Sequence, residues 1–239
     1  NFAFVPNMPS TVSQPGYTNS AGELHYLHAG SLHNHQYAHL FADFRARRDR
    51  YQTDFFANSI SATMANRQYA VNLNSHAFPD ESGQAQPYET YGPNSWGLMA
   101  GLASYGYGVL QPLVMPFDDY SPQNVALNTD SGTVLLNAAL GSTPFAPKHA
   151  VGVARNLLAR FQVSQSGYDA LIGRYGFRNA FNLGRTYTGQ FGHFPAQTIG
   201  LDLGPVAGSI ENFLSGLLWK FAMRSEFVWN SLSLAASAP

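Results

Sequence analysis

The chain has 239 residues, of which 45% are hydrophobic and only 11% are charged, against about 25% charged residues in an average protein. Its formal net charge of −1 lacks the basic excess that nucleic-acid or anionic-membrane binding requires. It contains no cysteine, which excludes disulfides and thiolate metal sites. We expect one domain-sized core with a polar, weakly charged surface that suits a neutral partner such as a carbohydrate.

Three regions follow from the composition along the chain. Residues 1–30 are rich in Pro, Asn, Ser and Gly, which predicts an extended N-terminal arm; residues 31–231 form the predicted domain and 232–239 a tail. No apolar run approaches the roughly 20 residues of a membrane span. The chain begins at Asn1 without Met or a signal pattern, so we expect a processed mature chain or a fragment. The lack of cysteine fits a secreted, periplasmic or cell-envelope protein.

Apolar side chains recur at helical spacing in several segments, and no strand-type alternation persists. The sequence therefore predicts a mostly α protein with long loops. In one segment, Val151, Ala154, Leu158 and Phe161 are expected to share the core face. Thr53 is expected to cap another segment. The predicted helices span residues 35–52, 53–73, 131–140, 143–161 and 206–223.

The segment 206–223 is apolar on almost every side, which is typical of a buried helix, yet it contains Glu211. An unpaired buried charge is costly, so Glu211 is expected to pair with a cation, to cap backbone groups or to face a wet cleft. Asp202 precedes this segment, either as a helix cap or as a second carboxylate. Because glycosidic hydrolysis uses two carboxylates, Asp202 and Glu211 are the candidate catalytic pair, with acid and base unassigned.

Four motifs resemble those of the glycoamylase-like family. "YGFRNAFNL" (175–183) and "IGLDLGPVAGSIENFLSGLLWKFAMRSEF" (199–227) are similar to its C-terminal signature, YGF-x-DAFN followed by LGIDQGP and MIENYRTGLLWKLFM. "HQYAHLFADFR" (35–45) and "YGPNSWGL" (91–98) match upstream in the same order. The resemblance spans roughly residues 31–230. It implies an α/α toroid of paired helices, partial or shortened here, and a β-1,2-glucanase type of glycoside hydrolase.

Residue chemistry and the resemblance together indicate a set of glycan-contacting side chains. Each has a structural alternative: Asp43 and Arg45 pairing with each other, Trp96 packing under a loop instead of stacking on a sugar, or Asn182 stabilising a turn. His35 and His39 lack a third ligand at metal spacing, so no metal or cofactor is expected. The candidates are Gln36, His39, Asp43, Arg45, Tyr91, Asn94, Trp96, Asp130 and Asn182.

Departures from the family pattern support a second hypothesis. Leu203 stands where the family usually has Gln, Leu214 where it has Arg, and the acidic position after "WGL" is missing. Each change removes a group that could bind sugar or balance Glu211. The alternative is therefore a non-catalytic structural or self-assembling protein derived from this family. A glycan is the first expected partner, and a second copy of the chain or an N-terminal partner segment are the others.

Overall fold

The computed structural model describes residues 12–19, 22–26, 31–49, 51–73, 77–79, 85–87, 90–103, 106–109, 132–161, 171–185 and 191–235. Helices account for more of these residues than strands, which confirms the mostly helical prediction, whereas the toroid stays a prediction. The helices are α1 (His33–Gln36), α2 (Ala38–Phe41), α3 (Phe55–Leu73), α5 (Leu136–Gly141), α6 (Pro147–Phe161), α7 (Gly200–Leu214), α8 (Leu217–Ala222) and α9 (Glu226–Ala235).

Short strands, which the sequence did not predict, accompany the helices. β7 (Val134–Leu135), β10 (Ala180–Arg185) and β11 (Phe191–His193) form an antiparallel sheet in the order β11-β10-β7, with Phe181 opposite Val134. β7 and β11, with two and three residues, are too short to show the alternation that marks a strand. The remaining pairs are β1 (Val12–Asn19) with β2 (Gly22–Tyr26), β3 (Ala77–Pro79) with β4 (Ala85–Pro87), β5 (Ala100–Ala103) with β6 (Gly106–Val109), and β8 (Ile172–Gly173) with β9 (Gly176–Phe177).

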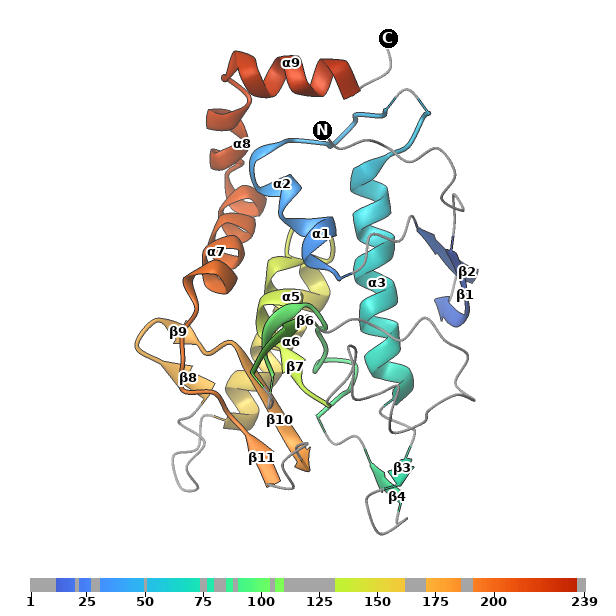
Figure 1. Cartoon of the computed structure of the whole chain (residues 1–239), viewed down its shortest axis with the longest axis vertical. Helices are drawn as coiled ribbons and strands as arrows, with labels where there is room; N and C mark the ends of the chain where they lie inside the picture. The colour runs from blue at the N-terminus through green and yellow to red at the C-terminus, as the bar shows by residue number, and fades with distance from the viewer. Residues whose placement is uncertain are drawn as a thin grey trace.

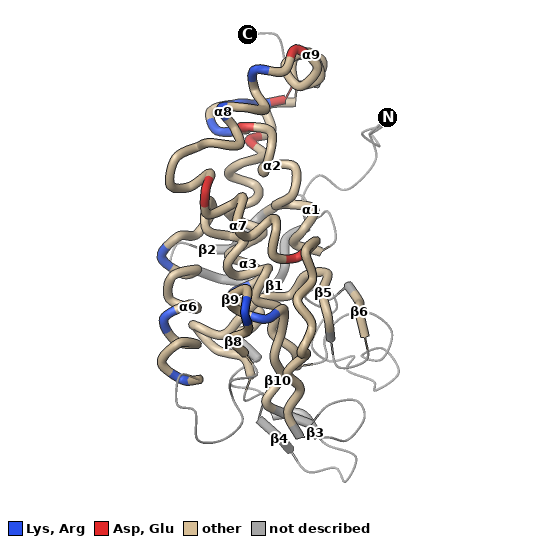
Figure 2. Tube along the Cα trace, turned by 90° about the vertical axis from the view of Figure 1, so that its left-hand side faces the viewer, with Lys and Arg blue, Asp and Glu red and all other residues tan. Residues whose placement is uncertain are grey.

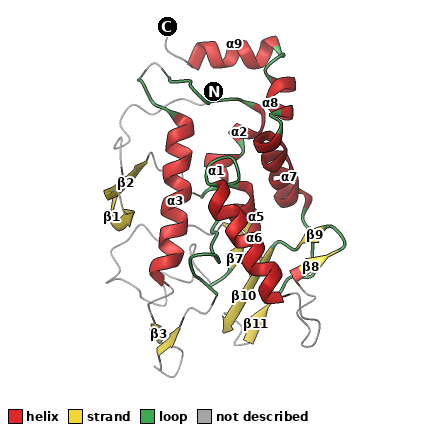
Figure 3. Ribbon diagram, turned by 180° about the vertical axis from the view of Figure 1, so that it is seen from behind, coloured by secondary structure: helices red, strands yellow, loops and turns green. Residues whose placement is uncertain are grey.

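The structure has a hairpin within the predicted N-terminal arm and a helix that continues into the predicted tail. β1 and β2 pair within the predicted arm and contact α3, and α9 extends through residues 232–235 of the predicted tail. α7 and α8 follow one another along one edge of the molecule, α9 runs across the end beyond them, and β10 and β11 lie toward the opposite end (Figures 1 and 3). Within the described residues, none of the helices combines the length and hydropathy needed to span a bilayer.

One core joins α3, the segment 90–99, α5, α6 and β10. Its largest side chains without exposed surface include Trp96, Tyr69, Leu157 and Phe181. The burial of whole aromatic and aliphatic side chains supplies most of the favourable free energy of folding. Gly97 permits close packing here, because a Cβ on it would lie 2.4 Å from the Leu135 carbonyl oxygen.

Three of the four predicted core positions of α6 lie one residue away from the observed core face, and the fourth, Phe161, is buried as predicted. The buried residues are Ala150, Val153, Leu157 and Phe161, whereas Val151 and Leu158 are 45% and 37% exposed. A rotation of about 100° separates neighbouring positions on a helix, so a one-residue error turns a predicted core face toward solvent.

The predicted helix over 35–52 is wrong beyond Phe41, because local side-chain bonds hold the chain in turns. The Asp43 carboxylate accepts a bond from the Arg45 backbone N–H (3.1 Å). Asp49 Oδ1 accepts bonds from the N–H groups of Tyr51 (2.9 Å) and Thr53 (2.8 Å). Asp side chains commonly compete in this way with helical hydrogen bonds.

The start of α3 is also capped differently from the prediction. Asp54 Oδ1 accepts a 2.8 Å hydrogen bond from the Ala57 N–H. Asp54 therefore caps the helix in place of Thr53. The backbone φ angle of Gln52 is 64°, a left-handed value that reverses the chain immediately before the helix.

The predicted single helix over 206–223 is two helices. α7 begins at Gly200 and ends at Leu214, and Gly216, with φ 67°, separates it from α8. Pro205 lies within α7 and has no N–H for the carbonyl of Leu201. The Tyr37 hydroxyl instead donates to that carbonyl at 3.1 Å, which ties the helix to the α1–α2 segment.

The prediction that this segment is buried on all sides is wrong. The buried positions of α7 are Asp202, Val206, Ser209 and Asn212, which are mostly polar. Outward positions are apolar, and Leu214 is 72% exposed. The large apolar side chains that are exposed on α7, α8 and α9 are those of Leu201, Ile210, Phe213, Leu214, Leu217, Phe221, Phe227, Trp229 and Leu234.

We expect Asn66→Ala to lower the free energy of unfolding by about 2 kcal/mol, measured by urea denaturation. Asn66 is buried on α3, where its Nδ2 donates to the Leu98 carbonyl (2.8 Å) and its Oδ1 accepts from the Leu98 N–H (3.0 Å). The substitution leaves both backbone groups buried without partners. Asn156→Ala, a loss of one exposed bond to the Asn94 carbonyl, is the control, and equal effects in the two variants would contradict this account.

Candidate functional site

Asp202 lies in the first turn of α7 with no exposed surface. Two neutral donors contact its carboxyl: the Tyr107 hydroxyl donates to Oδ1 at 2.9 Å, and Asn179 Nδ2 donates to Oδ2 at 2.6 Å. The Asn137 side chain, whose Nδ2 donates to the Ala100 carbonyl at 3.0 Å, is close enough to lower the pKa of this carboxyl. These three residues come from β6, from the residues just before β10 and from α5, so the Asp202 cluster brings together segments far apart in the sequence.

Burial raises the pKa of Asp202 above its ordinary value, and the hydrogen bonds from Tyr107, Asn179 and Asn137 only partly oppose this rise. The ion pairs among the described residues do not involve this carboxyl. Burial and the nearby Asp202 charge raise the pKa of Tyr37 to about 12. A raised pKa keeps a carboxyl protonated up to a higher pH than usual, which makes Asp202 a candidate proton donor.

Tyr107 connects this buried group to the surface. Its side chain is 47% exposed, although its hydroxyl contacts the buried carboxyl. Burial, the hydrogen bond to Asp202 and its charge raise the pKa of Tyr107, so the phenol stays a donor. Because Tyr107 lies on the short β5–β6 hairpin, a shift of that hairpin would expose Asp202.

Glu211 is not brought together with Asp202. The two residues are nine positions apart on α7, which places them about 13 Å apart along the axis and on opposite sides. Catalytic carboxylates flanking one glycosidic bond are separated by about 5–9.5 Å. Glu211 is half-buried, contrary to the expected interior position, and its Oε1 accepts a 2.5 Å bond from the Ser215 hydroxyl.

Gln36 and His39 are buried in the scaffold. Gln36 Nε2 donates to the Ala138 carbonyl (2.9 Å) and to the Ser142 hydroxyl (2.8 Å), which joins α1 to α5. His39 Nε2 contacts the Ser59 hydroxyl at 3.0 Å. Burial and the neighbouring His35 lower the pKa of His39 to about 4, against an opposing effect of Asp43, so the ring is neutral near pH 7. Within the described residues no cluster of three or more His, Cys, Asp or Glu could hold a metal ion.

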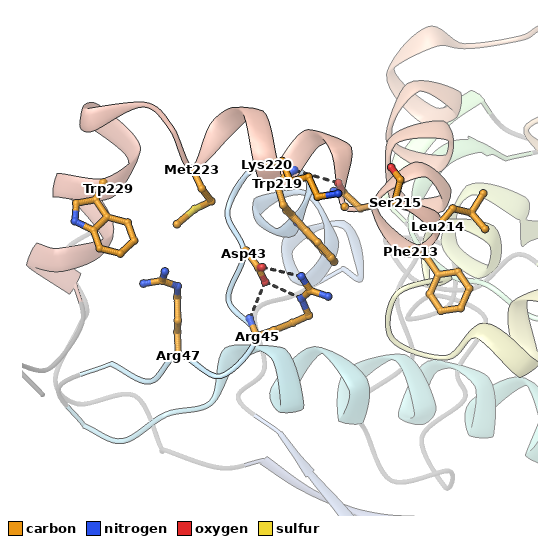
Figure 4. A pocket seen from close by; sticks show the side chains of 12 residues that line it. Asp43, Arg45, Arg47, Phe213, Leu214, Ser215, Trp219, Lys220, Met223 and Trp229 are labelled. Carbon is orange, nitrogen blue, oxygen red and sulfur yellow. Dashed lines mark hydrogen bonds and ion pairs between the residues drawn. The ribbon is translucent and has the colours of Figure 1, made fainter.

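Asp43 and Arg45 line a groove of about 480 Å³ between the α2–α3 connection and helices α7 to α9 (Figure 4). They pair with each other, with Arg45 Nε and Nη2 at 2.9 and 2.8 Å from the Asp43 oxygens. The Arg45 guanidinium lies 4.1 Å from the centre of the Trp219 ring, and Arg47 lies 4.8 Å from that of Trp229. We call this the Arg–Trp groove.

The remaining predicted contact residues are mostly internal. Trp96 has no exposed surface, which corrects the expectation of a sugar-stacking platform. Tyr91 is buried, with its hydroxyl 3.5 Å from the Thr133 carbonyl. Asn182 donates from Nδ2 to the Thr133 hydroxyl at 3.2 Å. Asn94 is exposed, and Asp130 lies outside the described residues.

Sequence reasoning missed the three partners of Asp202. Tyr107 lies in a segment without regular spacing, and Asn137 looked like part of an apolar helix. Asn179 carried a signal, because it occupies the position that is Asp in the YGF-x-DAFN signature. An amide here donates to Asp202, which an ionised carboxylate could not do.

A buried carboxyl with a raised pKa is the kind of acid that glycoside hydrolases use. A family model described as "Putative glucoamylase" matches residues 10–226, and the chain belongs to this glycoamylase family. A curated relative, the exo β-1,2-glucooligosaccharide sophorohydrolase (non-reducing end) of Parabacteroides distasonis, is 28% identical over 204 residues, which cover 85% of this chain and 22% of that protein.

Solved structures give the same family relationship. The endo-β-1,2-glucanase of Chitinophaga pinensis, solved with sophorotriose and glucose, has a TM-score of 0.67 and 25% identity, with 93% of this chain and 46% of that one covered. A β-1,2-glucanase of Parabacteroides distasonis has a TM-score of 0.63 and 27% identity, with 87% and 25% covered. The chain therefore spans less than half the length of these relatives.

We expect Asp202 to make stability fall as pH rises. Because burial raises its folded-state pKa above the unfolded value, its contribution is fully present below the unfolded pKa of about 4 and is lost as pH rises through the folded pKa. Urea unfolding from pH 4 to pH 8, compared between the wild type and Asp202→Asn, isolates this effect. A constant difference in unfolding free energy across that range would contradict the raised pKa.

Proposed function

We propose that this chain supplies the proton donor of a glycoside hydrolase acting on a β-glucan, and that Asp202 is that donor. The observation that carries the proposal is a fully buried carboxyl with neutral partners and a raised pKa. The β-1,2-glucan-hydrolase names of the relatives support the substrate class. A location outside the cytoplasm, in the periplasm, in the envelope or beyond the cell, is part of the proposal.

The chemistry follows from the protonated form of Asp202. The acid gives its proton to the glycosidic oxygen while the bond from that oxygen to the anomeric carbon breaks. Water then adds to the anomeric carbon and loses a proton to a second carboxylate. Within the described residues, no carboxylate hydrogen-bonds or pairs with Asp202. We propose that the second carboxylate comes from outside those residues, and that the β5–β6 hairpin shifts to admit the glycan.

Glu211 has a different place in this proposal. Its carboxylate accepts the Ser215 hydroxyl at the end of α7, directly before the Gly216 turn into α8. We therefore assign Glu211 a structural role, in which it holds the turn between α7 and α8. Asp43 and Arg45 remain proposed glycan contacts in the Arg–Trp groove, where the half-exposed Trp229 ring offers a flat surface to a sugar.

We expect Asp202→Asn to lower the rate of reducing-sugar release from β-1,2-glucan by at least about 100-fold, since the amide cannot donate an acidic proton. Glu211→Gln is expected to stay within about threefold of the wild type, because the amide oxygen still accepts the Ser215 bond. The measurement compares kcat/KM for the protein that carries this chain, with circular dichroism spectra to verify folding. Loss of activity in Glu211→Gln together with an active Asp202→Asn would overturn the assignment.

A second candidate function is self-assembly through the exposed apolar side chains of α7, α8 and α9. Leu214 is 72% exposed and Phe213 49%; α7 and α8 lie along one edge of the molecule and α9 runs across its end (Figure 1). With only 11% charged residues in the chain, little repulsion opposes association. The occupant that we propose for this face is a second copy of the chain.

We expect the chain to elute as an oligomer in size-exclusion chromatography with light scattering, because association would remove these exposed apolar side chains from water. The double substitution Phe213→Ser and Leu214→Ser should shift it to a monomer. Val151→Ser, at an exposed apolar position on α6, is the matched control. A monomeric wild type at micromolar concentration would remove the assembly function.

A further inference from the structure

A second groove, of about 650 Å³, lies between α3, the segment 93–94, α6 and α7. Four basic side chains line it: Arg67 from α3, and Lys148, His149 and Arg155 from α6. We call it the basic groove. Figure 2 shows α6 with blue segments spaced along it and no red one, on the opposite side of that view from β5 and β6.

Among the described residues, no carboxylate compensates the positive charge of this groove. None of the described lining residues is acidic, and the ion pairs of the described residues join Arg45 to Asp43 and Arg48 to Asp54 only. Arg67 is half-buried, and its Nε donates to the Pro93 carbonyl at 3.1 Å. A partly desolvated guanidinium without a carboxylate is unfavourable, so an anion at its remaining N–H groups would stabilise this arrangement.

Like charges converge on the same space. Burial, then Arg67, then Lys148 lower the pKa of His149, and no carboxylate acts in the opposite direction. Burial also lowers the pKa of Arg67. Arg67 and Lys148 thus disfavour a positive charge on His149. The positive potential that has this effect would attract an anionic ligand.

We propose that the basic groove binds an oxyanion group, a phosphate or a carboxylate carried by a small molecule or by a substituted sugar. The guanidinium of Arg67 presents paired N–H donors that match such a group, and the Lys148 ammonium adds a mobile point charge. The exposed Asn94 amide and the half-exposed Phe213 ring complete the lining. They offer a hydrogen-bonding group and an apolar wall to the rest of the ligand.

The first test is titration calorimetry of the protein with inorganic phosphate, glucose 6-phosphate, glucuronate and glucose. We expect saturable binding of at least one anionic probe, weakened by salt, and none of glucose. Preference for glucose 6-phosphate or for glucuronate identifies the oxyanion. Absence of saturable binding to all three anions, or equal binding of glucose, overturns the proposal. The readout is binding, so it does not depend on hydrolysis by the Asp202 site.

The second test uses charge-matched variants. Arg67→Gln and Lys148→Gln should each weaken binding of the best probe by about tenfold or more, since each removes a charge-assisted hydrogen bond. Arg160→Gln makes the same charge change at an exposed position of α6 outside the groove and should change the affinity by less than about twofold. Equal losses in Arg160→Gln and Lys148→Gln would show a diffuse charge effect and overturn the site; Lys148 is exposed, so this comparison does not depend on folding.

Discussion

The arrangement of the molecule depends on satisfying one buried carboxyl without a cation. Asp202 can be buried only if neutral donors reach its oxygens, because an unsatisfied carboxylate in the interior costs several kcal/mol. Tyr107 and Asn179 donate from two segments separated by more than seventy residues of sequence, and Asn137 adds a third contact from α5. The start of α7, the sheet edge at β10 and the β5–β6 hairpin are thus held by the same group that the proposed chemistry needs.

The inward face of α7 is mostly polar, and side chains of α8 and α2 lie close to the helix at Gly208. A Cβ on Gly208 would lie 2.8 Å from Leu218 Cδ1. Asn212 donates from Nδ2 to the Leu40 carbonyl (2.9 Å), while its Oδ1 accepts the Trp219 N–H (3.2 Å). This one amide holds α2, α7 and α8 together across the Gly216 turn. The large apolar residues of α7 are therefore directed outward, and their exposure is a consequence of how the helix is fixed.

Sequence patterns predicted the long elements and the family, and they failed where local polar bonds decided the structure. The 53–73 helix and the 143–161 helix are present with shifted starts because apolar spacing over many residues is a strong signal. The 35–52 helix is not, because Asp43 and Asp49 bind nearby backbone N–H groups. Apolar composition suggested that α7 is buried, but composition does not reveal which face lies against a neighbour.

The same limits apply to the candidate site. Asp202 could be singled out because it stands between glycines next to an apolar helix, and the family motif drew attention to it. Its pairing with Glu211 relied on closeness in sequence, and a helix places residues nine positions apart on opposite sides. Its true partners, Tyr107 and Asn179, are brought to it by tertiary contacts that no spacing rule contains. The Asp-to-Asn difference at Asn179 was the one sequence signal that pointed to them.

The net charge of −1 conceals a segregation of charge that bears on both proposals. A neutral glucan calls for hydrogen-bonding groups and a protonated acid, and the Asp202 cluster consists of a carboxyl, two amides and a phenol. The described lining of the basic groove has cations and no acid, and a neutral glucan would not compensate this charge. A neutral glucan that suits the Asp202 cluster therefore does not balance the charge of the basic groove, and an anion that suits the groove does not suit the cluster. The two are better explained by different chemical groups, either on separate molecules or on one glycan that carries an acidic substituent.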